Sequence, residues 1–147
     1  MKILIITQYF WPENFRINDL VGEMATYGHE VTILTGLPSY PKGEVFSDFL
    51  KRPNEFNEYK SSKIVRVPII TRGKSKLKLA LNYLSYVISS IIIGSWKLKG
   101  AKFDIIFVYE PSPITVGFTV YLVVAQLPVR FCWSLKPLAA PELRKCL

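Results

Sequence analysis

Short apolar runs alternate along the chain with longer amphipathic stretches, a pattern that predicts parallel strands connected by helices. Continuous apolar runs, typical of strands covered on both faces, occupy residues 2–7, 30–35, 64–69 and 104–109. Apolar residues at helical spacing predict helices at residues 14–27, 76–98 and 113–126. Because strands and helices alternate, we expect an α/β fold: a Rossmann-like parallel sheet with helices on both faces.

The first strand-helix-strand unit has a signal at each junction. Asn14 is the predicted N-cap of the first helix, and Gly28 suits the left-handed position after its last turn. In a doubly wound sheet the four strands lie in the spatial order 3-2-1-4. The tail beyond them is expected to pair loosely as a fifth strand or to stay unpaired.

Ligands of open parallel sheets bind at the carboxyl ends of the strands, beside helix N-termini. The loops that follow the first, second and fourth strands are rich in aromatic and polar side chains. The substrate-binding residues predicted there are Tyr9, Trp11, Glu13, Asn14, Arg16, Tyr40, Lys42, Glu110 and Ser112.

The net charge of +8 is concentrated in the middle of the chain. Ten basic residues and no Asp or Glu lie between Lys60 and Lys102. Such a block favours an anionic partner, such as an anionic membrane surface or a lipid pyrophosphate; the alternative is a merely solvated face. Nucleic acid is not expected as a partner, because no motif that reads nucleic acid accompanies the charge.

Residues 79–96 are uncharged and just long enough to cross a membrane. Asn82 and four serines argue against a span, and the next strand has to return to the same sheet. We therefore favour a helix lying on the membrane surface, with a true span and an ordinary core helix as alternatives. The predicted membrane-contact residues are Lys74, Lys76, Lys78, Trp96, Lys97 and Lys99.

The sequence carries no motif for a metal or a cofactor, so none of either is expected. It has no Asp-x-Asp pair, no phosphate-binding GxxxxGK[ST] loop, no HExxH and no Gly-rich dinucleotide fingerprint. Cys132 and Cys146 form no CxxC pair, which fits free thiols in a reducing cytoplasm. The single histidine, His29, lies in a helix-to-strand turn and is interpreted as structural.

Three strings resemble a known family: MKILIITQYFWPENFRINDLV, GHEVTILTGLPSYPKG and FDIIFVYEPSPITVGF. They look like the N-terminal domain of a family-4 retaining glycosyltransferase of the GT-B fold. The likeness is to the colanic-acid and O-antigen type, which builds bacterial surface polysaccharides such as lipopolysaccharide and capsule. Two departures are a Phe-Trp-Pro-Glu string where many relatives have Gly-Gly, and the absence of an Asp-Leu-Trp-Pro-Glu string after the fifth strand.

The resemblance implies a membrane-associated fragment of a transferase. Residues 1–128 would form an incomplete acceptor-side domain, and residues 129–147 a divergent or frame-shifted tail. The whole enzyme would transfer a sugar from a nucleotide-sugar donor to a polyprenyl-diphosphate-linked acceptor. It would act in the cytoplasm, peripherally on the inner face of the plasma membrane. The chain alone would lack a donor-binding C-terminal half, so no catalytic residue is assigned and its status as an enzyme stays open.

The candidate residues each have a functional and a structural interpretation. Arg16 would bind a phosphate with the helix amides, or face solvent. Glu13 would bind sugar hydroxyls, or favour the helix dipole; Glu110 would bind sugar hydroxyls, or simply end its strand. Tyr9 and Trp11 would stack on a sugar or isoprenoid, or pack onto the helix. The alternative function is a non-catalytic membrane- or partner-binding module, such as half of a split enzyme.

Overall fold

A six-stranded sheet forms the centre of the protein. The computed structural model describes residues 1–73 and 75–109, and the backbone of residues 130–134. The spatial order of the strands is β3 (Glu58–Tyr59), β4 (Ser62–Val67), β2 (Glu30–Gly36), β1 (Lys2–Ile6), β5 (Ile105–Tyr109) and β6 (Arg130–Ser134). All neighbouring strands are parallel except β3 and β4.

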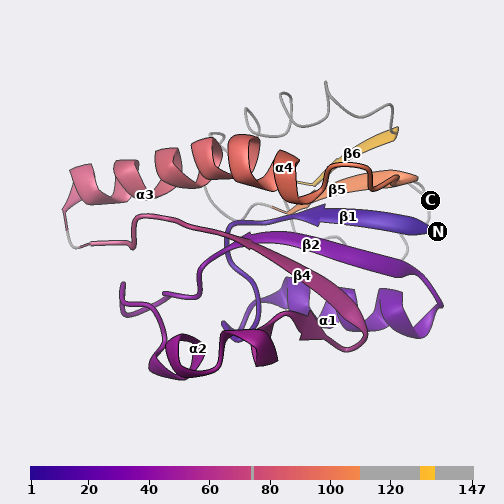
Figure 1. Ribbon diagram of the computed structural model, residues 1–147, viewed down its shortest axis with the longest axis horizontal. Helices are drawn as coiled ribbons and strands as arrows, with labels where there is room; N and C mark the ends of the chain where they lie inside the picture. The colour runs from indigo at the N-terminus through magenta and orange to yellow at the C-terminus, as the bar shows by residue number, and fades with distance from the viewer. Residues whose placement is uncertain (74, 110–129, 135–147) are drawn as a thin grey trace.

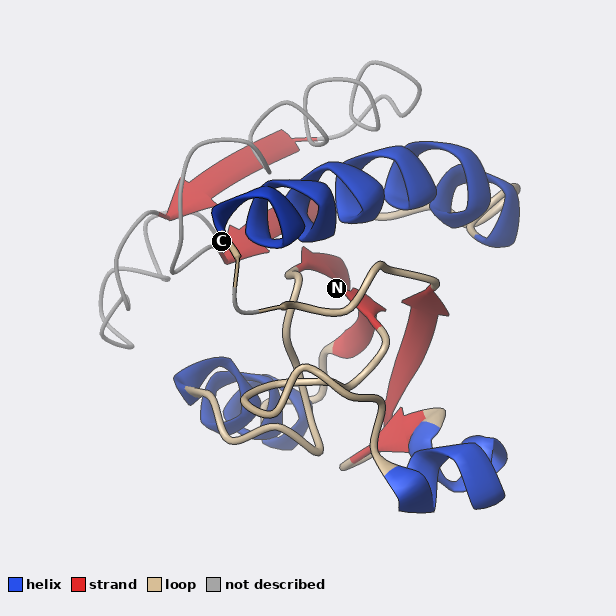
Figure 2. Cartoon of the chain, turned by 90° about the vertical axis from the view of Figure 1, so that its left-hand side faces the viewer, coloured by secondary structure: helices blue, strands red, loops and turns tan. Residues whose placement is uncertain are grey.

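Helices cover both faces of this sheet. Helix α1 (Arg16–Thr26) lies on one face. On the other, α3 (Lys76–Ser89), the π-helical turn η2 (Ser90–Gly94) and α4 (Ser95–Lys97) follow one another without a break. We call this continuous 22-residue element the long helix. Figures 1 and 2 show α1 and the long helix on opposite sides of the strands.

The alternation of side chains along the strands produces two apolar clusters, one on each face. Ile3 and Ile5 of β1 pack with Val21 of α1. The intervening Leu4 and Ile6 pack with Tyr86 of the long helix. These six residues are at most 1 % exposed, so the central strand is covered on both faces, as its continuous apolar run predicts.

The predicted α/β, Rossmann-like sheet with helices on both faces is confirmed. The predicted order 3-2-1-4 corresponds to β4-β2-β1-β5. In the tail, β6 pairs in parallel with β5, so this segment joins the sheet. The predicted helix at residues 113–126 lies outside the described residues, and the division into residues 1–128 and 129–147 stays a prediction.

Two local predictions at the ends of α1 have different outcomes. Gly28 has a φ of +77°, which confirms the left-handed position expected after the helix. The predicted N-cap Asn14 is wrong, because Phe15 is the N-cap and makes no side-chain capping bond. The amide of Asn18 instead donates to the carbonyl oxygen of Glu13 at 2.7 Å, which ties the first turn to the preceding loop.

The connection between β2 and β4 contains three short elements that the apolar pattern does not predict. They are α2 (Ser47–Lys51), the 3-10 turn η1 (Pro53–Phe56) and β3. Each is too short to carry a helical or alternating signal.

Candidate functional site

The long helix has apolar side chains on the face that does not contact the sheet. Its packed face includes Asn82, Tyr86, Val87, Ser90 and Gly94, all buried. The exposed apolar residues are Leu77, Leu81, Leu84, Ile88, Ile92 and Trp96, whose exposed fractions run from 39 % to 75 %. At a spacing of about 3.6 residues per turn, these six lie opposite the packed face. We call them the exposed stripe.

The long helix approaches the sheet closely along its packed face. A Cβ atom added at Gly94 would lie 3.1 Å from a methyl carbon of Leu34, so a larger residue would require Leu34 to shift by a few tenths of an ångström. The hydroxyl of Tyr86 donates to the carbonyl oxygen of Leu34 at 3.3 Å. The ammonium group of Lys97 donates to the carbonyl oxygen of Arg66 at 2.9 Å.

A buried polar cluster around Asn82 ties the long helix to the loops beside it. Asn82 is fully buried, and its Oδ1 accepts bonds from Gln8 Nε2 at 2.7 Å and from the Tyr9 hydroxyl at 3.0 Å. Its Nδ2 donates to the carbonyl oxygen of Ile70. An unsatisfied buried polar group is costly, so this network fixes the position of the helix against the sheet.

Exposed lysines lie at both ends of the long helix. Lys76 and Lys78 are in its first turn, and Lys97 and Lys99 are at its end. The ion pairs found among the described residues are Lys2–Glu30 and Arg52–Glu55. None of these four lysines therefore forms an ion pair with a described acidic residue. The predicted contact Lys74 lies outside the described residues. Length and composition alone would let the helix cross a membrane, a property that it shares with core helices.

The structure brings three of the predicted substrate-binding residues together. Glu13 is buried, and its Oε1 accepts bonds from the backbone N–H groups of Ser39 at 2.8 Å and Tyr40 at 2.6 Å. Burial raises the pKa of the Glu13 carboxyl group, although these two bonds oppose the shift. The rings of Tyr9 and Tyr40 lie 5.6 Å apart, and Phe15 packs against both.

The other predicted substrate-binding residues do not join this group around Glu13. Trp11 packs against Phe56 and Tyr59, with ring centroids 5.0 Å and 5.5 Å apart. Three more are exposed and form no side-chain hydrogen bond or ion pair with the described part of the chain: Asn14, Arg16 and Lys42. Glu110 and Ser112 lie outside the described residues. Substrate binding by this set stays a prediction.

Sequence reasoning did not single out Arg66 as more than one member of the basic block. It is 7 % exposed and donates to the carbonyl oxygens of Gly36 at 3.1 Å, Trp11, and Phe56 at 3.4 Å. Burial lowers the pKa of Arg66 to about 10, and the negative charge of Glu13 partly opposes this. The signal in the sequence that could have identified it is an arginine inside the otherwise apolar run at residues 64–69.

No group of three or more His, Cys, Asp or Glu side chains within the described ranges is placed to hold a metal ion. The groups that the long helix does present are the exposed stripe and the exposed lysines at its two ends.

Comparison with known proteins gives a match among solved structures. No family model matches the chain, and no curated protein matches it. Among solved structures, the chain is similar to the C-terminal domain of the PF1911 hydrogenase from Pyrococcus furiosus. The TM-score is 0.57 and the sequence identity 18 %, over 90 % of each chain. At this identity the likeness shows the fold alone, so hydrogenase chemistry is not transferred.

This match corrects the interpretation of the sequence strings. The matching structure is a hydrogenase domain, not a glycosyltransferase, and no family model supports the resemblance. The assignment to family-4 retaining glycosyltransferases of the GT-B fold is therefore wrong. The associated role in O-antigen, capsule, colanic-acid or lipopolysaccharide synthesis falls with it.

Residues of the first two strings contact one another within the fold. Glu13 in the first string bonds the backbone of Ser39 and Tyr40 in the second, and Tyr9 packs on Tyr40. The carbonyl oxygen of Trp11 is held by Arg66. These residues therefore have roles in packing the two loops together, and such packing does not identify a reaction.

Proposed function

We propose that this domain is a non-catalytic membrane-binding module that attaches peripherally to an anionic phospholipid surface through its long helix. The observation that carries the proposal is the exposed stripe, which lies opposite the face that packs on the sheet. A helix with both faces apolar needs a second covering besides the sheet.

Charge supports a lipid surface as this covering. The chain from Lys60 to Lys102 contains no acidic residue, and lysines flank the stripe at both ends. Near an anionic surface each lysine contributes about 1 kcal/mol, while the apolar side chains enter the boundary between head groups and acyl chains. Trp96, which is 75 % exposed, is a residue type enriched at this boundary.

The buried contacts of the long helix favour attachment to the surface over crossing. A helix that crossed the bilayer would have to leave the sheet. Asn82 would then lose its bonds to Gln8 and Tyr9, and its amide would enter hydrocarbon. Because the cytoplasmic leaflet carries the anionic lipids, we place the domain at the inner face of the plasma membrane.

Removing lysines should weaken binding to anionic vesicles selectively. With Lys76, Lys78 and Lys99 replaced by Gln, we expect partitioning onto phosphatidylserine-containing vesicles to fall about 100-fold, because three contributions of roughly 1 kcal/mol are lost. Binding to phosphatidylcholine vesicles should barely change. Vesicle flotation at low and high salt measures both, and the wild type should bind less at high salt.

The control removes the same charge elsewhere. Lys2, Lys51 and Lys60 are exposed and lie outside the long helix. Their replacement by Gln should lower binding much less than the helix variant does. Equal losses in the two variants would show that only net charge matters. If the protein binds neither kind of vesicle and forms a stable dimer in solution, a second copy covers the stripe. Either result would contradict the proposal.

A further inference from the structure

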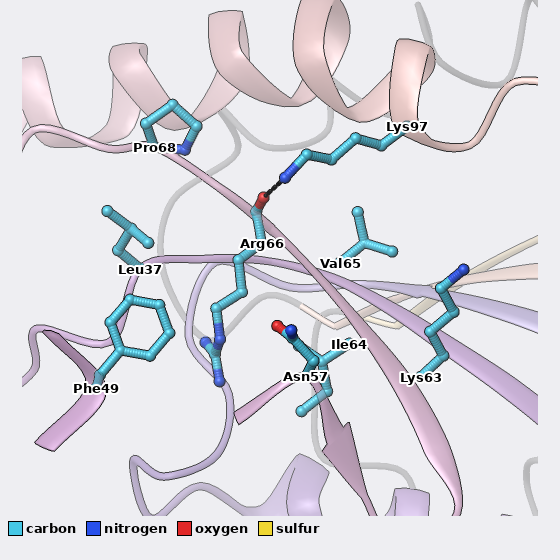
Figure 3. Close-up of a pocket in the computed structure, with 9 residues that line it drawn as sticks. All are labelled: Leu37, Phe49, Asn57, Lys63, Ile64, Val65, Arg66, Pro68 and Lys97. Atoms are coloured by element: carbon cyan, nitrogen blue, oxygen red, sulfur yellow. Dashed lines mark hydrogen bonds between the residues drawn. The ribbon is translucent and has the colours of Figure 1, made fainter. Parts of the chain in front are cut away.

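A hollow follows the open edge of β4, on the side of this strand away from β2. The short strand β3 pairs only with Ser62 and Lys63, so residues 64–67 have no described strand on that side. The hollow has a volume of about 520 Å³. Because it follows an edge, residues from both faces of β4 line it (Figure 3).

The polar groups that line the hollow are all basic or neutral. They are Lys63, Arg66, Lys97 and Asn57, and none of the described residues that line it is acidic. Lys97 reaches from the long helix to the edge of β4, where its ammonium group donates to the carbonyl oxygen of Arg66 at 2.9 Å (Figure 3). One of its three N–H donors is thereby used and two are left. Glu58 is paired with Lys63 across β3 and β4, but no ion pair forms between them.

Arg66 adds a buried positive charge to the lining of the hollow. Its hydrogen bonds go to neutral carbonyl oxygens, and its buried Nε has no partner. Glu13 acts on it only through space, because no ion pair joins the two. The positive potential of the hollow is therefore incompletely compensated by the described residues.

Apolar side chains complete the wall. Leu37 and Phe49 line the hollow beside Arg66, whose guanidinium carbon lies 5.3 Å from the centroid of the Phe49 ring. A volume of about 520 Å³ exceeds the space that a bare phosphate needs, so an attached organic group fits as well.

We propose that this hollow binds a phosphate group carried on a small organic group. The ammonium groups of Lys63 and Lys97 and the side-chain amide of Asn57 donate to its oxygens, and Arg66 contributes its buried positive charge. Charge-assisted hydrogen bonds of this kind are the strong ones in anion sites. The proposal goes beyond attachment to a membrane, since the same chemistry recognises a soluble phosphate ester.

Two sources would supply such a group. Lys97 directly follows Trp96 of the exposed stripe, so a lipid head group with a terminal phosphate is one source. A soluble phosphate monoester is the other. Both are tested without a bilayer, so failure here is distinct from failure of membrane attachment.

The probes are inorganic phosphate, glycerol 3-phosphate and dioctanoyl phosphatidic acid below its critical micelle concentration, with dioctanoyl phosphatidylcholine for comparison. Titrations followed by NMR of the isotope-labelled protein should show saturable shifts at Asn57, Lys63 and Lys97 for the phosphate-bearing probes. Tighter binding of phosphatidic acid than of glycerol 3-phosphate identifies a lipid source, and equal binding identifies a soluble one. Shifts that do not saturate, or that appear equally with phosphatidylcholine, would overturn the proposal.

Lys63→Gln and Lys97→Gln should each weaken binding about fivefold, which corresponds to roughly 1 kcal/mol. Asn57→Asp, which places a carboxylate in the hollow, should weaken it further. Lys102→Gln removes the same charge from an exposed position outside the hollow and should leave the affinity unchanged. If Lys102→Gln weakens binding as much as Lys97→Gln does, the interaction is nonspecific. If Asn57→Asp has no effect, the hollow is not the site.

Discussion

Replacing Leu84 and Ile88 together with Asp is expected to lower partitioning onto anionic vesicles at least 100-fold. The two side chains are 54 % and 49 % exposed, so their replacement should leave the fold intact. Burying an apolar side chain of this size contributes about 1.5–3 kcal/mol, and two such contributions would be lost. Two negative charges would also be added against an anionic surface. Vesicle flotation measures the partitioning, and circular dichroism checks the fold.

A matched control carries the same two substitutions on exposed apolar residues elsewhere. Tyr27 and Leu50 are 74 % and 67 % exposed and lie outside the long helix. Tyr27→Asp with Leu50→Asp adds the same charge and should reduce binding only a few-fold. If this control loses binding as completely as the stripe variant, the exposed stripe is not the contact surface.

Replacing Asn82 with Ala is expected to lower the free energy of unfolding by about 2–4 kcal/mol, because one residue satisfies several buried groups. Gln8 Nε2 and the carbonyl oxygen of Ile70 would each lose a bond, as would the hydroxyl of Tyr9. Urea unfolding followed by circular dichroism measures the loss.

Asn54 provides the comparison. It is exposed, and its side chain accepts one long bond of 3.5 Å from Asn57. Asn54→Ala should change the free energy of unfolding by less than about 0.5 kcal/mol. A loss below about 1 kcal/mol in Asn82→Ala would contradict the role of Asn82 in fixing the long helix on the sheet.

The order of the strands could be predicted because apolar periodicity depends on burial, and burial depends on the position of a strand in the sheet. The run at residues 2–7 is apolar throughout because β1 is central and covered by α1 and by the long helix. Gly28 could be predicted because a positive φ strongly favours glycine. The apolar run and the glycine are each visible within a short stretch of the sequence.

Contacts between distant loops could not be predicted in the same way. The hydrogen bonds from Arg66 to the carbonyl oxygens of Gly36 and Trp11 depend on how the end of β2 and the loop after β1 lie beside β4. Glu13 also satisfies the backbone of another loop, a contact that neither the ligand nor the helix-charge interpretation included. The glycosyltransferase resemblance rested on strings from these loops, and the residues of those strings that the structure describes make packing and backbone contacts within the fold.

Hydropathy identified the long helix but could not say which of its faces meets the sheet. Residues 79–96 are uncharged on all sides, so span, surface and core remained open. The packing of Tyr86 and Gly94 on Leu34 determines the buried face and, by exclusion, the exposed stripe.

The depth of the long helix in a bilayer distinguishes surface attachment from crossing. Nitroxide labels on cysteines replacing Leu77, Leu84 and Ile92, one at a time with Cys132 and Cys146 changed to Ser, report depth by electron paramagnetic resonance on anionic vesicles. A helix lying on the surface places all three labels at a similar depth, about 5–10 Å below the phosphates. A label at Leu84 near the bilayer centre, about 15 Å deep, with shallower labels at Leu77 and Ile92, would contradict surface attachment, as would three labels that remain in water.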